Sequence, residues 1–417
     1  MRVLHVNKFL YRRGGAEAYM EDVAAHQSAA GHEVQFFGMA HPLNTHTGLS
    51  HHFPPLMEME PAPQGLLDQA RVAGRVIWSS SAQQGMKGAL TEFRPDLVHF
   101  HNIYHQLSPS VVAAARRAGV ATVMTLHDYK LACPNYLFLD TKGVCEACVG
   151  GHWTQPVRRR CKGGSLAASA LLTVEASLHH GLGAYGGVDR FVCPSTFLHD
   201  KMVESGIYPE RLRSVPNFVD TPPGPRWRGP GGPLVFAGRL EHYKGTHVLL
   251  QAVALLPEHV TLDVVGDGPE RQRLEVQADR TVPGRVRFHG RLPKSEVTRL
   301  ISGASMLVAP SLWYENQPLV VLEAMSIGVP VVGSALGGFT ELLGPTGAGR
   351  LAAPGEPAAL ARVVRELLDE PEAAAAAGAA GRLEARERYS VDVHLAQLGV
   401  VYAEALSLHP ARGPVVP

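Results

Sequence analysis

Two glutamates lie close together in the stretch WYENQPLVVLEAM, which runs from Trp313 to Met325. Glu315 lies in a polar segment, whereas Glu323 is surrounded by apolar residues. Carboxylates are rarely fully buried without a partner, because an isolated buried charge is very costly. The two carboxylates could be the acid and base of a hydrolase, or each could bind part of a ligand.

The helix predicted between them favours ligand binding. Pro318 suits a first helical position, and Gly328 with Pro330 ends the helix. Glu323 would then lie on the second turn, roughly 7 Å from the helix start. From there its side chain would reach a ribose diol, whereas Glu315, ahead of the helix, would meet a sugar.

Two cations and a glycine pair follow other predicted strands. Arg239 and Lys244 flank a turn in FAGRLEHYKG, where they could clamp a diphosphate, although solvated surface charge is the alternative. Gly14 and Gly15 lie at a predicted helix start, where backbone amides favour anions. A Gly-Gly turn also occurs merely to satisfy loop geometry.

These residues must be positioned by alternating strands and helices. In the first half, RVLHVN, HEVQFFGM, DLVHFHN and ATVMTLHD predict strands with helices between them. A segment rich in proline and glycine, residues 221–233, predicts a linker, after which the alternation restarts. This pattern predicts an α/β fold of two doubly wound Rossmann-like domains, with the site in the cleft at the carboxyl ends of the strands.

The predicted domain limits follow from this pattern. Residues 1–220 form an N-terminal domain with a cysteine-rich insertion at 129–165, and residues 221–385 form a C-terminal domain. Residues 386–417 provide a C-terminal helix that packs back toward the N-terminal domain, and then a loose tail. The segment from Gly65 to Leu90 predicts one helix, which either packs on the surface or contacts an acceptor or a membrane.

Composition sets the broad class. The 417 residues are 45% hydrophobic and 18% charged, an ordinary globular balance, and a net charge of +1 gives no reason to expect nucleic acid as a partner. No signal peptide or membrane-spanning stretch is recognisable, so we expect a soluble, cytoplasmic protein.

At this point the motifs resemble a known family. In order along the chain, GGAE, HD, PNFVD, FAGRL with KG, GDGP, ENQPLVVLEAMSIGVPVV and GGFTELL resemble the retaining, nucleotide-sugar-dependent glycosyltransferases of family 4. The resemblance covers nearly the whole chain and implies the GT-B fold. It implies transfer of a hexose-type sugar from a UDP- or GDP-sugar to a saccharide, lipid-linked or small-molecule acceptor in polysaccharide or glycoconjugate biosynthesis, without a catalytic metal.

The resemblance also implies roles for particular residues. Arg239 and Lys244 would hold the diphosphate, Glu315 the donor sugar and Glu323 the ribose. Gly15 would lie against the phosphates or the acceptor, and His127 beside the 6-position of the transferred sugar. The family's FGLP-like segment is here Asn316, Gln317, Pro318 and Leu319, so this loop, expected to face the sugar, leaves the donor preference open. Glu341, in the family's GG-x-x-E segment, has a less defined role.

Four of the five cysteines lie in the insertion, with the pattern C-x11-C-x2-C-x12-C. We favour a structural zinc site at Cys133, Cys145, Cys148 and Cys161, because the insertion has too few apolar residues to pack by itself. Free thiols, disulfides and an iron–sulfur cluster are the alternatives.

Two further groups could meet partners. The histidines of HFHNIYH (His99, His101 and His105) are predicted at a strand end facing the cleft, where one could contact an acceptor. The run Arg158–Arg160 is either a solvated face or a contact with anionic lipid at the inner face of the cell membrane. Two other classes also remain open: a different nucleotide-sugar enzyme such as an epimerase, and a non-catalytic sugar-nucleotide-binding module.

Overall fold

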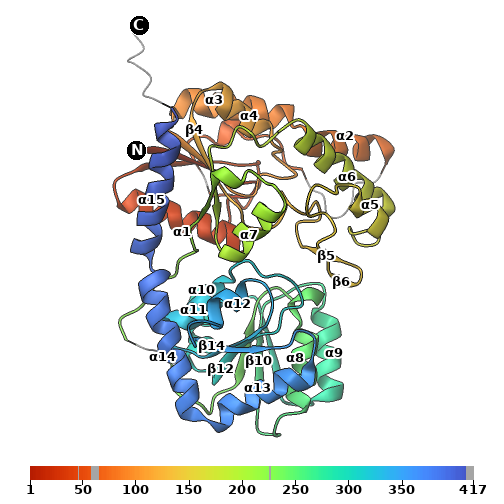
Figure 1. Ribbon diagram of the computed structural model, residues 1–417, viewed down its shortest axis with the longest axis vertical. Helices are drawn as coiled ribbons and strands as arrows, with labels where there is room; N and C mark the ends of the chain where they lie inside the picture. Colours follow the sequence, from red (N-terminus) through yellow and green to blue (C-terminus); the bar gives the residue numbers. More distant parts are fainter. Residues whose placement is uncertain (46, 58–64, 225–226, 410–417) are drawn as a thin grey trace.

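The computed structural model describes residues 1–45, 47–57, 65–224 and 227–409, which form two α/β domains one above the other (Figure 1). Each domain is built on a six-stranded sheet whose paired strands are all parallel. The α/β architecture of two doubly wound domains, expected from the strand and helix alternation, is therefore present.

The N-terminal sheet has the order β2-β1-β3-β4-β7-β8. Its strands are β1 (Arg2–Val6), β2 (Glu33–Phe37), β3 (Leu97–Phe100), β4 (Ala121–Thr125), β7 (Arg190–Cys193) and β8 (Leu212–Ser214). The helices of this domain are α1 (Gly15–Ala29), α2 (Leu66–Ile77), α3 (Ser80–Phe93), α4 (Ser110–Arg117), α5 (Gln155–Arg159), α6 (Leu166–Gly181) and α7 (Thr196–Glu204), with 3-10 turns η1 (Ser50–His52) and η2 (Pro209–Arg211).

The C-terminal sheet has the order β11-β10-β9-β12-β13-β14. Its strands are β9 (Leu234–Ala237), β10 (Leu262–Val265), β11 (Val286–Gly290), β12 (Met306–Ala309), β13 (Val331–Ser334) and β14 (Gly349–Ala352). Its helices are α8 (Thr246–Ala254), α9 (Arg271–Thr281), α10 (Lys294–Ser302), α11 (Leu319–Ser326), α12 (Gly338–Leu343) and α13 (Pro357–Asp369), with the 3-10 turn η3 (His242–Lys244).

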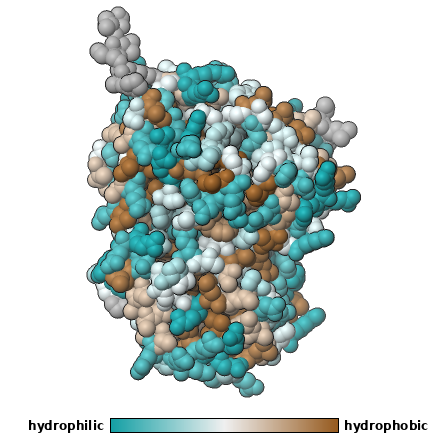
Figure 2. All heavy atoms as spheres, viewed as in Figure 1, coloured by the Kyte–Doolittle hydropathy of each residue, from teal (hydrophilic) through white to brown (hydrophobic). Residues whose placement is uncertain are grey.

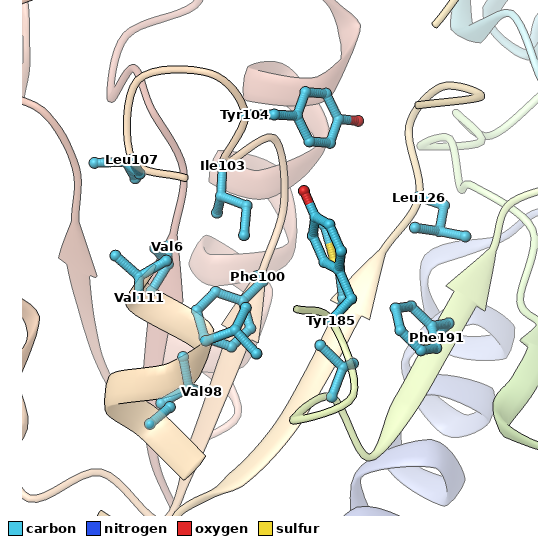
Figure 3. Close-up of a cluster of buried hydrophobic side chains, with 14 of the residues drawn as sticks. Val6, Val98, Phe100, Ile103, Tyr104, Leu107, Val111, Leu126, Tyr185 and Phe191 are labelled. Carbon is cyan, nitrogen blue, oxygen red and sulfur yellow. The ribbon is translucent and has the colours of Figure 1, made fainter. Parts of the chain in front are cut away.

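The two faces of the N-terminal sheet differ in what they bury. One face packs Val98 and Phe100 of β3 with Val111 of α4 and Phe191 of β7 in a cluster of buried hydrophobic side chains (Figure 3). Side chains alternate across a strand, so the opposite face of β3 carries Leu97 and His99. That second face is covered by α1 and by the chain's C-terminal helix.

Two consecutive helices join the domains along one side of the molecule (Figure 1). The first, α14 (Pro371–Arg388), packs on α11 in the C-terminal domain. The second, α15 (Val391–Ser407), packs on β4 and β7 of the N-terminal sheet and buries Leu398, Val401 and Tyr402. The tail expected from residue 410 onward lies outside the described residues.

The prediction of one helix from Gly65 to Leu90 is wrong. The segment forms α2 and α3, which are separated at Trp78 and Ser79. The Ser79 backbone N–H donates to Ser108 Oγ, and its hydroxyl accepts from the Ala82 N–H, so Ser79 caps a new helix.

The surface and the helices give no sign of a membrane span. Figure 2 shows polar and apolar side chains interspersed over both domains on the face it presents. In the part of the chain that the structure describes, no helix is both long and apolar enough to cross a membrane.

Candidate active site

The strand order of the C-terminal sheet brings three of the predicted residues together. The order reverses between β9 and β12, and ligands of doubly wound sheets bind at such a switch point. Arg239 and Lys244 follow β9, and Glu315 follows β12. Both loops therefore start at the carboxyl ends of two adjacent strands and lie next to each other.

Glu315 is held at the carboxyl ends of these two central strands by hydrogen bonds to one of its two carboxylate oxygens. Its Oε1 accepts hydrogen bonds from Lys244 Nζ at 2.6 Å, Ser311 Oγ at 2.7 Å and Trp313 Nε1 at 2.9 Å. The Lys244 ammonium also lies 5.2 Å from the centre of the Trp313 ring. Among the described residues, Oε2 of Glu315 has no hydrogen-bond partner, so it is available to a ligand hydroxyl.

A glycine pair supports the loop that carries Glu315. Gly337 has a φ of 59°, and the Gly338 N–H donates to the Glu315 carbonyl oxygen at 2.7 Å. A Cβ at Gly338 would lie 1.7 Å from the Asn316 carbonyl oxygen. Only glycine fits there, which explains the glycine pair of the GGFTELL segment.

Arg239 and Glu323 lie at the edge of the same region with looser contacts. The Arg239 side chain is 55% exposed and pairs with Glu241 at 3.0 Å. Glu323, on α11, is 4.0 Å from Lys294 and 28% exposed. Desolvation raises the pKa of Glu323, so a partner that donates hydrogen bonds would stabilise its ionised form.

The loop expected to face the donor sugar instead directs its two amides toward the N-terminal domain. Asn316 Oδ1 accepts from Ser195 Oγ at 2.6 Å, and its Nδ2 donates to the Leu126 carbonyl oxygen at 3.2 Å. Gln317 Oε1 accepts from the Asn217 N–H. These two side chains are buried, and their hydrogen bonds join the domains.

Other predicted residues also meet across the cleft. A Cβ built on Gly15, at the start of α1, would lie 3.6 Å from Leu319 Cδ1. Pro318 is the N-cap of α11 and so lies one residue before its expected position in the first turn. Glu341 accepts hydrogen bonds from Thr196 Oγ1 and the Phe197 N–H at the start of α7, which gives it an interdomain contact.

His127 follows β4 on the N-terminal side of the cleft and is partly exposed. Its Nε2 lies 3.0 Å from His101 Nδ1. Burial lowers the pKa of His127 to about 3, so the ring is neutral at pH 7. A neutral imidazole can both donate and accept one hydrogen bond.

The placement of the HFHNIYH histidines at the cleft is wrong for two of the three. His99 and His101 are fully buried between the N-terminal sheet and its helices. His105 contacts the fully buried Glu175, whose other oxygen accepts from Lys130 Nζ at 2.7 Å. The period of two along β3 turns His99 and His101 to the face that α1 and α15 cover.

The cysteine-rich insertion packs better than its composition indicates. Tyr129 and Phe138 are fully buried in the core of the N-terminal domain, with Cys133 beside them. Asn135 Nδ2 donates to the carbonyl oxygens of Leu139 and Cys161, which ties the two ends of the insertion together. The insertion includes a hairpin of β5 (Leu139–Asp140) and β6 (Gly143–Val144).

Its four thiols are free and close enough to influence one another. Burial raises the pKa of Cys161 to about 11, helped by the charges of Cys133 and Cys145. In a tetrahedral zinc site the sulfurs are about 3.8 Å apart. Among the described residues, the groups of three or more ligand atoms that lie within 4.8 Å of one another do not include these thiols. Zinc here stays a prediction, which metal analysis of reductively purified protein tests.

Several residues that build the site were not predicted from the sequence. Ser311 and Trp313 lie within four residues of Glu315. The Ser311 hydroxyl and the Trp313 indole N–H can each donate to a nearby carboxylate, so this proximity could have identified them as partners of Glu315. Ser195 and Asn217, by contrast, are 121 and 100 residues from their amide partners. Nothing local in the sequence signals those contacts.

Known glycosyltransferases resemble this chain over most of its length. A family model described as Glycosyltransferase Family 4 matches residues 13–222, and one described as Glycosyl transferases group 1 matches residues 228–384. The 2-deoxystreptamine glucosyltransferase of Streptomyces kanamyceticus is 34% identical over 350 residues, which cover 81% of this chain and 85% of that protein. The chain belongs to glycosyltransferase family 4. It is a glycosyltransferase, as the motifs predicted.

Further similar proteins fit the family. The D-inositol 3-phosphate glycosyltransferase of Streptomyces coelicolor is 28% identical over 444 residues, which cover 96% of this chain and 89% of that protein. Among solved structures, the sucrose-phosphate synthase of Thermosynechococcus elongatus has a TM-score of 0.70 at 19% identity and covers 98% of this chain and 99% of its own. Anabaena HepE, in complex with UDP and glucose, has a TM-score of 0.66 at 20% identity and covers 97% and 99%. These neighbours confirm the GT-B fold.

Proposed function

We propose that this family 4 enzyme transfers a hexosyl group from a UDP- or GDP-sugar to a hydroxyl of an acceptor, with retention of configuration. One observation carries the proposal. Glu315 is fixed through Oε1 by Lys244, Ser311 and Trp313, while Oε2 stays free at the switch point of the sheet. A carboxylate held in this way is prepared to accept hydrogen bonds from a sugar.

The surrounding charges suit a nucleoside diphosphate. Arg239 and Lys244 bring two positive charges to the edge where the diphosphate would lie, and fixed charges stabilise the charge that develops on a leaving group. Glu323 on α11 would accept hydrogen bonds from the ribose diol, which would relieve the cost of its desolvation. On the opposite side of the cleft, His127 would meet the 6-hydroxyl of the sugar.

The interdomain contacts would exclude water from the reaction. Asn316 and Gln317 hold the domains together next to Glu315, which would shield an oxocarbenium-like centre. The bond from the anomeric carbon to the diphosphate breaks, and the acceptor oxygen bonds to that carbon from the same face. The acceptor's proton passes to the departing phosphate oxygen, so retention needs no enzyme nucleophile.

For the acceptor we propose a polyhydroxylated ring, either a sugar or a cyclitol, free or linked to a lipid. The two relatives named above act, by their names, on 2-deoxystreptamine and on D-inositol 3-phosphate, and both of these are cyclitols. The N-terminal domain supplies polar groups for such a ring at the carboxyl ends of β1 and β4. Asp128 there accepts a hydrogen bond from the Tyr104 hydroxyl at 2.6 Å.

A lipid-linked acceptor would agree with peripheral contact at a membrane. Three exposed arginines, Arg158–Arg160, lie on and after α5, which packs on α6. Leu178 on α6 and Leu182 just after it are 40% and 78% exposed. We propose that this surface contacts anionic lipid. Co-sedimentation with phosphatidylglycerol vesicles, but not with phosphatidylcholine vesicles, would support the contact, and its absence with both would refute it.

A panel of UDP-, GDP- and ADP-sugars tests the proposed function. Each donor is scored for calorimetric binding and for slow hydrolysis, with wild type beside Arg239→Ala and the surface control Arg362→Ala. We expect one uridine or guanosine donor to bind and to be hydrolysed, and Arg239→Ala alone to abolish most of the hydrolysis. Binding without turnover on any donor or acceptor would favour a non-catalytic module.

A further inference from the structure

Four histidines of the N-terminal domain form a row on the sheet face that α1 and α15 cover. His5 lies on β1 directly beside His99 of β3 in the strand register. His101 and His127 continue the period of two beyond the ends of β3 and β4. His5, His99 and His101 are completely buried, and neighbouring ring centres lie 4.3–5.3 Å apart.

Hydrogen bonds connect this row to the C-terminal helix. From the cleft inward, His127 Nε2 lies 3.0 Å from His101 Nδ1, and His101 Nε2 lies 3.0 Å from His5 Nδ1. His5 Nε2 lies 2.8 Å from Gln27 Oε1 on α1. The Gln27 amide nitrogen then donates to the Tyr402 hydroxyl on α15 at 3.0 Å.

The chain continues beyond Tyr402 to a third strand. The Tyr402 hydroxyl lies 2.7 Å from His99 Nδ1, and His99 Nε2 lies 2.7 Å from Thr125 Oγ1. The ring nitrogens of His5, His99 and His101 lie close enough together for a metal ion. All six of these ring nitrogens already have hydrogen-bond partners within the protein. Hydrogen bonding therefore explains why the three rings lie close together, without a metal ion.

Neutral rings give the chain a direction. Burial lowers the pKa of His5 to about 4 and those of His99 and His101 well below the ordinary value. Each neutral ring donates one hydrogen bond and accepts one. Because Gln27 turns its oxygen to His5, the His5 Nε2 must donate, His101 must donate to His5, and His127 must donate to His101. The Nε2 of His127 therefore carries its proton, and its Nδ1 is left as an acceptor.

We propose that Gln27 and Tyr402 are positioning residues that fix the tautomer of His127 from the C-terminal helix, so that His127 Nδ1 accepts a hydrogen bond from a donor-sugar hydroxyl. This proposal rests on the proposed function in one respect only, namely that the hydroxyl belongs to the donor sugar. Tyr402 holds the Gln27 amide in this orientation by accepting from its nitrogen while the Tyr402 hydroxyl donates its own proton to His99 Nδ1. Without the Tyr402 hydroxyl, the amide can turn over, which reverses every donor and acceptor in the chain up to His127.

Nitrogen NMR on protein labelled with ¹⁵N-histidine reads the tautomer directly. The His127 signals are assigned by their loss in His127→Gln. We expect the Nε2–H tautomer at His127 in wild type, and a mixture or the Nδ1–H tautomer in Tyr402→Phe and in Gln27→Met. An Nδ1–H tautomer in wild type, or an unchanged tautomer in both folded variants, would overturn the proposal.

His394→Gln is the matched control. His394 is also buried on α15 and bonds to the Pro216 carbonyl oxygen and to the Tyr19 hydroxyl. The Tyr19 hydroxyl joins the hydrogen-bonded chain at Thr125, the end away from Gln27 and His127. The His394→Gln substitution should leave the His127 tautomer unchanged, even if it lowers the stability of the protein. A shift of the tautomer in His394→Gln as large as in Tyr402→Phe would show a general loss of packing and would overturn the specific role.

A kinetic comparison tests the same role in the reaction. With a hexose donor, Tyr402→Phe should lower turnover about tenfold, the equivalent of one lost hydrogen bond. With the matching pentose donor, which lacks the 6-hydroxyl, the loss should be small. Equal losses with both donors would contradict the proposal. If no nucleotide sugar is turned over at all, the proposed function fails, while the NMR result still decides the tautomer.

Discussion

The two sheets hold their polar side chains in opposite ways. The N-terminal sheet buries uncharged imidazoles in a hydrogen-bonded chain that ends at His127. The C-terminal sheet places charged groups at its edge, where Arg239 is 55% exposed and Lys244 is paired with Glu315. The N-terminal side is thus prepared to orient a neutral group, and the C-terminal side to take up a charged one.

Solvation explains the difference. Neutral rings can be buried at low cost when every nitrogen has a partner, whereas isolated charges cannot. The cations of the C-terminal edge therefore need water, a carboxylate or a phosphate. In the proposed function, a diphosphate replaces the contact that Glu241 provides to Arg239 and lies beside Lys244, with the C-terminal domain as the donor side.

The largest effect should come from the charged side. Lys244→Ala removes the ammonium that holds Glu315 and that, in the proposed function, faces the leaving group, so we expect turnover to fall roughly 10²- to 10³-fold. Steady-state kinetics with the donor found in the panel measure the change. A loss below fivefold with an intact fold would show that the C-terminal charges do not act on the leaving group.

The next largest effect should be a difference in acid sensitivity, with the N-terminal domain losing stability before the C-terminal domain. Burial gives His5 a folded pKa of about 4 against an ordinary 6.5, so the unfolded chain binds the proton first as the pH falls. The free energy of unfolding should therefore decrease from about pH 6.5 toward pH 4, by about 1.4 kcal/mol for each pKa unit, or about 3 kcal/mol for His5. The decrease is absent above the unfolded pKa.

Hydrogen exchange at pH 7 and pH 5, corrected for intrinsic rates, measures this effect by region. The amides of β1, β3 and β4 should lose protection before those of β9 and β12. Earlier loss in the C-terminal sheet would contradict the assignment of the acid-sensitive groups.

Glu323→Ala should weaken nucleotide binding by on the order of 1.5–3 kcal/mol, the value of a hydrogen bond to a charged group. The binding of UDP or GDP is measured by calorimetry. Glu296→Ala, which changes a surface glutamate paired with Arg299, serves as the control. An unchanged affinity in Glu323→Ala would remove the ribose role.

The smallest effect should lie at the contact between the domains. Asn316→Ala removes two interdomain hydrogen bonds but no side chain that is proposed to bind the nucleotide or its diphosphate. We therefore expect a loss of about 1 kcal/mol in the stability of the closed arrangement. Small-angle scattering should show a wider molecule, and kcat/KM should fall by less than in Lys244→Ala. The control Gln277→Ala removes an amide contact within the C-terminal domain. A loss in Asn316→Ala as large as in Lys244→Ala would indicate direct sugar contact.

The fold followed well from the sequence because alternating buried strands and helices permit few arrangements. Glu315, Arg239 and Lys244 were also found from their places after strands. The direction of Asn316 and Gln317 was not, because their partners are on the other domain and no local pattern reports a contact over 100 residues or more. The histidine row was not predicted, because His5 and His127 come from different strands than the HFHNIYH segment, and Tyr402 is 375 residues from Gln27.

The anomeric configuration of the first product is the most direct test of the proposed transfer. The enzyme is mixed with the α-linked donor that the panel identifies and with its acceptor, or with water, and proton NMR records the first sugar released. We expect an α-linked product whose formation depends on Lys244 and Glu315. A β-linked product would contradict retention and the same-face reaction between the two domains.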